Sequence, residues 1–205
     1  MLADDSNFAK TRGRKINLNI KEKLFITKNG KSMALRSVTA EEAEQMIQHL
    51  RITHSESYRN LNQPPNYWKE FSIEAEAKIL ADFETSSSKF MLAAFYNNII
   101  VGGLGFIGSQ GDFLKHNGRI GMSIQQEFCS SGIGTEMMRY ALLLAKEYGF
   151  HRVELTVRSY NKAGISLYEK VGFQRVGLLK DTALIDGEYT DEYLYQIILP
   201  NSGVI

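Results

Sequence analysis

Residues 129–135, Cys-Ser-Ser-Gly-Ile-Gly-Thr, combine two glycines with small hydroxyl side chains, directly before a long apolar run that predicts a helix. The start of a helix leaves backbone N–H groups without partners and carries about half a positive charge, so it attracts anions. Glycines let an anion approach the backbone closely. The loop is therefore predicted to hold a phosphate group through Ser131, Gly132, Ile133, Gly134 and Thr135.

Two common phosphate-binding loops do not fit this segment. A Walker A loop needs Lys and then Ser or Thr after its second glycine, whereas Gly134 is followed by Thr135 and Glu136. A dinucleotide-binding fingerprint needs a third glycine where Met137 stands, and an acidic residue at the end of the next strand. A plain helix start is the competing interpretation of such a glycine pair.

The elements around the loop must bring it next to a reacting centre. The helix that follows it ends at Gly149 and lies between two expected strands, residues 119–124 and 152–158. Such a strand, helix, strand unit crosses over in parallel. Asn161 can then cap a short helix that Gly172 ends.

The flanking segments favour antiparallel pairs and two further helices. Two-residue hairpin turns are predicted at Asn29-Gly30 and Asn97-Asn98. A capping box of Thr39 and Glu42 opens a helix that continues to Ile52, residues 55–70 are expected to be irregular, and a second helix spans Ile73 to about Phe83. The chain should close with strands Phe173–Leu178 and Asp191–Ile198, joined by a loop with a turn at Asp186-Gly187.

This order of elements predicts an α/β (α+β) fold, with a mixed, mostly antiparallel central sheet of about seven strands and helices on both faces. Residues 1–22 are polar and are expected to be an N-terminal extension. Residues 23–205 are expected to form a single domain.

Composition excludes several classes of protein. A net charge of +1 in 205 residues gives no reason to expect binding to nucleic acid or to an anionic membrane. No apolar run approaches the roughly 18 residues that a membrane span needs. A single cysteine, Cys129, allows no internal disulfide and favours a reducing, cytoplasmic location. The four histidines show no ligand spacing, so no metal is expected.

Three stretches together, RIGMSIQQEF, CSSGIGTEM and VRSYNKAGISLYEKVGF, resemble the central motifs of the GNAT superfamily of acetyl-CoA-dependent N-acetyltransferases. The resemblance covers about residues 33–198. It implies the GNAT fold, acetyl-CoA as cosubstrate, and direct attack of a primary amine on the thioester. One departure is Cys129, which stands where the family's loop usually has Gln or Arg, and this predicts weaker cosubstrate binding.

The resemblance also implies roles for residues outside the loop. Ile124 and Gln126 match the strand whose backbone pairs with the pantetheine arm, with their N–H groups near the thioester. Asn161 matches the residue that caps the next helix near the cosubstrate, and a plain helix cap is the alternative. Tyr168 matches the tyrosine that protonates the leaving thiolate, and core packing is the alternative.

The acceptor is less closely defined. The segment GLLKDTALIDGEYTDEYLYQIIL resembles a GNAT subgroup that acetylates small amines, amino acids or protein N-termini. Glu56, Tyr189 and Asp191 are the expected acceptor-side residues, because an acidic rim attracts a cationic amine; ordinary turn and surface roles are the alternative. A small-molecule amine is the expected acceptor. A protein N-terminus, such as that of a ribosomal protein, and a non-catalytic acyl-CoA-binding module are the alternatives, and a homodimer is the default assembly.

Overall fold

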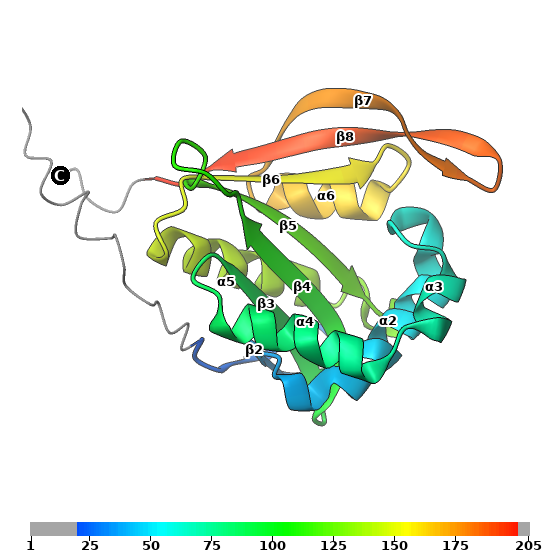
Figure 1. The fold of residues 1–205 in the computed structure, drawn as a ribbon, viewed down its shortest axis with the longest axis vertical. Helices are drawn as coiled ribbons and strands as arrows, with labels where there is room; N and C mark the ends of the chain where they lie inside the picture. The colour runs from blue at the N-terminus through cyan, green and yellow to red at the C-terminus, as the bar shows by residue number, and fades with distance from the viewer. Residues whose placement is uncertain (1–19, 201–205) are drawn as a thin grey trace, which may run out of the picture.

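The structure is a computed structural model that describes residues 20–200, and most of the predicted extension 1–22 lies outside the described residues. Its centre is an eight-stranded sheet (Figure 1) in the order β1-β2-β3-β4-β5-β6-β8-β7. The strands are β1 (Lys23–Ile26), β2 (Ser32–Ser37), β3 (Lys89–Tyr96), β4 (Ile99–Gly108), β5 (Asn117–Ile124), β6 (Arg152–Arg158), β7 (Gln174–Ile185) and β8 (Glu188–Ile198).

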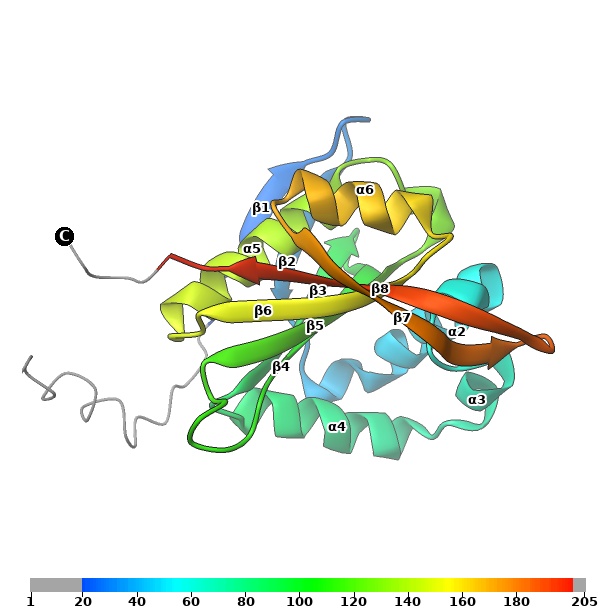
Figure 2. The ribbon, with the colours of Figure 1, turned by 90° about the horizontal axis from the view of Figure 1, so that it is seen from above.

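Helices cover both faces of this sheet. They are α2 (Ala43–Ser57), α3 (Pro65–Glu70), α4 (Ile73–Thr85), α5 (Ile133–Glu147) and α6 (Lys162–Lys170), with short 3-10 helices at Ala40–Glu42, Tyr58–Asn60 and Gln126–Phe128. Figure 2 shows α5 and α6 on one face and α2, α3 and α4 on the other. Among residues 20–200, none of these helices is long and apolar enough to cross a membrane.

Each face has its own apolar core. On one side α5 buries Ile133, Met137, Met138, Ala141 and Leu144 at helical spacing against the sheet. On the other side α2 and α4 bury a smaller cluster against β3 and β4, which includes Met46, Leu80 and Phe95. Because both faces are covered, the inner strands contain long apolar runs.

The parallel pair β5 and β6 is short, and this opens the sheet. The two strands pair only from Asn117↔Arg152 to Arg119↔Glu154. Beyond that point β5 continues to Ile124 and β6 continues to Arg158 beside β8. The ends of β5 and β6 therefore separate in a splay between the two helical layers.

The predicted fold class is confirmed, with eight strands instead of about seven. The turns at Asn97-Asn98 and Asp186-Gly187 are also confirmed, since all four residues have positive φ. The two-residue turn at Asn29-Gly30 is wrong. Thr27 N–H donates to the Lys31 carbonyl across a three-residue loop, in which Gly30 alone takes the left-handed conformation.

Residues 55–70 are more regular than predicted. The helix α2 continues to Ser57, and α3 begins with Pro65, whose fixed φ suits the first position of a helix. Aromatic packing of Trp68 against His54 and Phe71 stabilises this short helix. The closing strands are also longer than predicted, because the expected loop between them continues the hairpin with an irregular register between Leu179 and Ala183.

Candidate functional site

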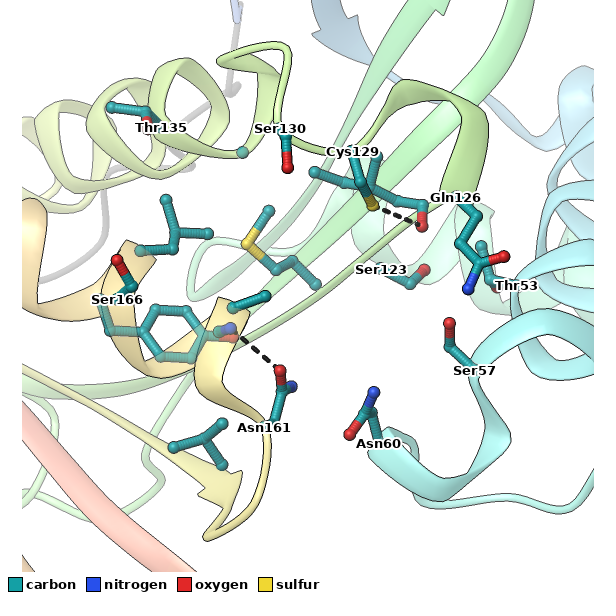
Figure 3. A pocket seen from close by; sticks show the side chains of 18 of the residues that line it. Thr53, Ser57, Asn60, Ser123, Gln126, Cys129, Ser130, Thr135, Asn161 and Ser166 are labelled. Atoms are coloured by element: carbon teal, nitrogen blue, oxygen red, sulfur yellow. Dashed lines mark hydrogen bonds between the residues drawn. The ribbon is translucent and has the colours of Figure 1, made fainter.

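A cavity of about 720 Å³ lies in the splay between β5 and β6. It is lined by the ends of these two strands, the loop before α5, one face of α6, and α2 with the residues that follow it. Figure 3 shows polar side chains on both of its sides: Thr53, Ser57 and Asn60 on one, and Ser130, Thr135, Asn161 and Ser166 on the other. One cavity thus joins segments from both helical layers.

The glycine loop forms the start of α5 as predicted. Gly132 precedes the helix with φ of +99°, a conformation that favours glycine. A Cβ on Gly134 would lie 3.0 Å from Leu167 and 3.1 Å from Ile124, so a larger residue would crowd this wall. The side chain of Ile133 is buried in the core, and Gly132, Gly134 and Thr135 line the cavity.

Ser131 differs from its predicted role. Its hydroxyl is buried and donates to the Phe128 carbonyl at 2.6 Å, so this hydroxyl holds the loop together instead of facing the cavity. Its carbonyl accepts from the N–H of Lys28 at 2.9 Å, which ties the loop to the first hairpin. The donors that the loop offers to a ligand are its backbone amides and the hydroxyls of Ser130 and Thr135.

The two backbone amides predicted near the thioester have different partners. Gln125 N–H donates to the Val101 carbonyl of β4, so alternation along the strand turns the Ile124 N–H away from β4, into the splay. Gln126 N–H already donates to the Glu56 carboxylate at 2.8 Å. The structure therefore favours Ile124 over Gln126 as a donor to a bound ligand.

Asn161 and Tyr168 both lie at the cavity, on opposite ends of α6. Asn161 is the helix cap that the sequence predicted, since its side chain accepts from Gly164 N–H at 3.0 Å. Tyr168 is only 9% exposed, and burial raises the pKa of its phenol to about 12. Tyr168 therefore stays protonated at neutral pH.

The opposite side of the cavity is polar and carries a buried charge pair. Glu192 of β8 lines the cavity and bonds through its carboxylate to Arg158 at 2.7 Å. Arg158, 4% exposed, also donates to the Leu61 carbonyl and the Asn62 side chain. This pair fixes the connection between α2 and α3 against the end of β6.

The three predicted acceptor residues lie outside the cavity lining. Glu56 is exposed and bonded to Gln126, as described above. Tyr189 is 69% exposed on the β7–β8 hairpin. Asp191 pairs with Lys180 and accepts from Asp181 N–H, because strand alternation turns it away from its neighbour Glu192.

Sequence reasoning missed the polar side chains on α2. Thr53 and Ser57 follow Met46 and Leu50 at helical spacing, so they continue the buried face of that helix into the cavity. This change from apolar to small hydroxyl residues on one face was the available signal. Both residues lie beyond Ile52, where the predicted helix ends, whereas α2 continues to Ser57.

Among residues 20–200, no three His, Cys, Asp or Glu side chains are grouped closely enough to hold a metal ion. The buried His49 instead bonds to Ser123, which lines the cavity, at 2.9 Å. Burial lowers the pKa of His49 to about 4, so this ring is neutral at pH 7.

The chain matches one family model and several proteins that are named as N-acetyltransferases. Residues 48–173 match the model of the "Acetyltransferase (GNAT) family". The chain is 25% identical over 133 residues to the [ribosomal protein uS5]-alanine N-acetyltransferase of Escherichia coli, covering 64% of this chain and 63% of that protein. It is 26% identical over 168 residues to an N-alpha-acetyltransferase of Sulfurisphaera tokodaii, covering 82% and 93% of the two chains.

An amino-acid N-acetyltransferase and a solved structure also match this chain. The L-amino acid N-acetyltransferase AaaT of Escherichia coli is 30% identical over 103 residues, which are 50% of this chain and 64% of that protein. The crystal structure of a GNAT-family acetyltransferase from Streptococcus pneumoniae superposes with a TM-score of 0.77 at 24% identity, covering 82% of this chain and 99% of that one. The last match shows a shared fold.

Proposed function

The chain belongs to the acetyltransferase (GNAT) family, and from this premise we propose that it is an acetyl-CoA-dependent N-acetyltransferase whose acceptor is a primary amine of a small molecule. The observation that carries the proposal is one cavity lined by the glycine loop, by Ile124 and by Tyr168. These are the parts needed to hold a phosphate, to polarise a carbonyl and to protonate a leaving group.

The residues present fit coenzyme A. The start of α5 offers amides and the positive end of a 15-residue helix to a diphosphate. The splay gives an extended pantetheine arm access to the edge of β5, where strand-like backbone groups are turned outward. We place the diphosphate at Gly132–Thr135 and the arm beside Ile124, with Asn161 next to it.

Acetyl-CoA supplies an acetyl group activated as a thioester. We assign to the Ile124 amide the stabilisation of negative charge on the thioester oxygen as the amine attacks. As the C–N bond forms and the C–S bond breaks, the nitrogen gives up a proton to water and the leaving sulfur takes one up. We assign this second proton to Tyr168, because its phenol is protonated at neutral pH and the residue lines the cavity. The acceptor must reach this point from the side of α2 and Glu192.

The acceptor side is bridged at one end, and this favours a small molecule. Arg59 pairs with Asp186 and Glu188 at the tip of the β7–β8 hairpin, and Tyr58 donates to the same Asp186. Figures 1 and 2 both show this hairpin reaching over the α3 side of the molecule. A groove that is open at both ends suits a polypeptide, whereas a site closed at one end suits a short amine.

The α-amino group of a protein is the second candidate acceptor. One relative reported above is named as an N-acetyltransferase of a ribosomal protein, and another, which matches over 93% of its length, is named as an N-alpha-acetyltransferase. The chain spans only 63% of the length of the first of these, so its name does not fix the acceptor here.

The test of the proposal is thiol release from acetyl-CoA in the presence of a panel of acceptors. Spermidine, methionine and other amino acids represent small amines, and peptides with N-terminal Ala or Ser represent protein substrates. The proposal expects turnover with at least one small amine at a kcat/KM at least tenfold above that of any peptide. Turnover with peptides alone would assign the second candidate, and binding of coenzyme A without turnover would identify a non-catalytic module.

Replacing Cys129 by Arg is expected to tighten acetyl-CoA binding about threefold to tenfold, because a guanidinium offers charged donors to a phosphate. The thiol is exposed at the first position of the loop, so the larger side chain displaces no core residue. Titration calorimetry with coenzyme A measures the effect, and Cys129→Ser is the control that adds no charge. Equal or weaker binding by Cys129→Arg would contradict this prediction.

A further inference from the structure

The glycine loop carries no basic residue between Cys129 and Thr135, yet a basic side chain lies against it. Lys28, in the loop between β1 and β2, lines the cavity together with Gly132, Gly134 and Thr135. It also lines a smaller adjoining hollow of about 180 Å³ between the first hairpin and the first turn of α5. A lysine from the start of the chain thus lies beside a loop more than one hundred residues later in the sequence.

The backbone fixes Lys28 in this position. Its N–H donates to the Ser131 carbonyl at 2.9 Å, and the neighbouring Thr27 closes the hairpin by pairing with Lys31. The Lys28 side chain runs alongside Gly132, because a Cβ on that glycine would lie 3.7 Å from Lys28 Cγ and 4.0 Å from its Cε. The Lys28 side chain therefore extends along Gly132, the residue that caps α5.

The charge of Lys28 is not neutralised within residues 20–200. The other two lysines of this hairpin pair with carboxylates, Lys23 with Glu136 and Lys31 with Glu127. No carboxylate in the described part of the chain lies within 4.0 Å of the Lys28 ammonium. Lys170, at the end of α6, also lines both the cavity and the smaller hollow, but its backbone makes no hydrogen bond to the glycine loop.

We propose that Lys28 binds the diphosphate of coenzyme A and supplies the positive charge that Cys129 does not. This rests on the proposed function and adds a residue to its binding site. The side chain lies over the start of α5, where the loop amides already favour an anion, so the ammonium and the amides act on the same phosphate. The first hairpin is then part of the cosubstrate site.

The test is Lys28→Ala, with titration calorimetry on three ligands at two salt concentrations. Lys28→Ala is expected to weaken binding of coenzyme A about tenfold and to make it less dependent on salt. Dephospho-coenzyme A keeps the diphosphate, so the same loss of about tenfold is expected. S-Acetylpantetheine has no phosphate, so the variant and the original protein should bind it equally.

Two matched variants control for net charge and for shape. Lys115→Ala removes the same charge from the loop between β4 and β5, near the far end of α5, and should leave binding unchanged. Lys28→Arg keeps the charge and should retain affinity within about threefold. Unfolding midpoints should stay unchanged, because alanine at position 28 keeps the N–H bond to Ser131.

The outcomes separate this inference from the proposed function. If the original protein binds coenzyme A and Lys28→Ala binds it equally well, the inference is wrong and the proposed function stands. A loss for coenzyme A that disappears with dephospho-coenzyme A also overturns it, since the contact would then be to the 3′-phosphate. If the original protein binds no coenzyme A at all, the proposed function itself fails.

Discussion

Replacing Tyr168 by Phe is expected to lower kcat about 100-fold at saturating acetyl-CoA, because a positioned general acid contributes on the order of 10²–10⁴ in rate. The phenol lines the cavity from the end of α6, on the same side as the glycine loop. Phenylalanine keeps the ring and its packing against Phe173, so only the proton donor is lost. The measurement is thiol release under steady-state conditions with the best acceptor of the panel.

The pH dependence gives a second test of the same residue. Burial raises the pKa of Tyr168 from its ordinary value near 10 to about 12. A general acid acts in its protonated form, and a raised pKa keeps the phenol protonated up to higher pH. We therefore expect no fall in kcat between pH 7 and pH 10, where an unperturbed tyrosine would already be half ionised.

Tyr195 provides a matched control for Tyr168. It is also a buried tyrosine with its pKa raised to about 12, chiefly by desolvation, and its ring lies 6.4 Å from that of Tyr168. Its hydroxyl donates to Glu169 and it does not line the cavity. Tyr195→Phe should change kcat less than threefold. An unchanged kcat in Tyr168→Phe would show that the acid is another group or water.

The parts of the site that the sequence predicted depend on local structure. The glycine loop, the Asn161 cap and the helix that carries Tyr168 follow from residues within a few positions of one another. The partner of the Ser131 hydroxyl was not predicted, because this hydroxyl bonds three residues back to Phe128 and this depends on the bend of the loop. Local chemistry thus identified residues on the α5 and α6 side of the cavity.

The acceptor side depends on contacts between distant segments, and these were not predictable from one sequence. Arg158 meets Asn62 and Glu192 only because the sheet places β6 beside β8 and the fold brings the end of β6 next to the residues that follow α2. Asp191 and Glu192 are equivalent by charge, and only the strand register turns Glu192 toward the cavity. Lys28 was likewise ordinary in sequence, since its position depends on the pairing of the first hairpin with residue 131.

Replacing Arg158 by Met is expected to destabilise the protein by about 3–5 kcal/mol, because it leaves a largely buried carboxylate without its partner. Arg158 is 4% exposed and Glu192 is 13% exposed, so water replaces the lost ion pair poorly. In a chain of this size the midpoint of thermal unfolding should fall on the order of 10 °C. Urea unfolding followed by circular dichroism measures the change in free energy.

The same substitution should act selectively on the acceptor. Arg158 holds the Leu61 carbonyl and the Asn62 side chain, which form one wall of the cavity, whereas the glycine loop has no contact with it. In the fraction that remains folded, KM for the amine should rise at least tenfold while the affinity for coenzyme A changes less than threefold. Equal losses for both ligands would mean that the whole cavity had collapsed.

A double variant distinguishes the buried charge from simple loss of packing. Arg158→Met with Glu192→Leu removes both charges and keeps apolar volume at both positions, so it should recover most of the stability lost in the single variant. It should not recover acceptor binding, because the anchor of residues 61 and 62 and the carboxylate at the cavity are both gone. If the double variant is as unstable as the single one, the cost lies in lost packing and hydrogen bonds of Arg158 and not in the orphaned charge of Glu192.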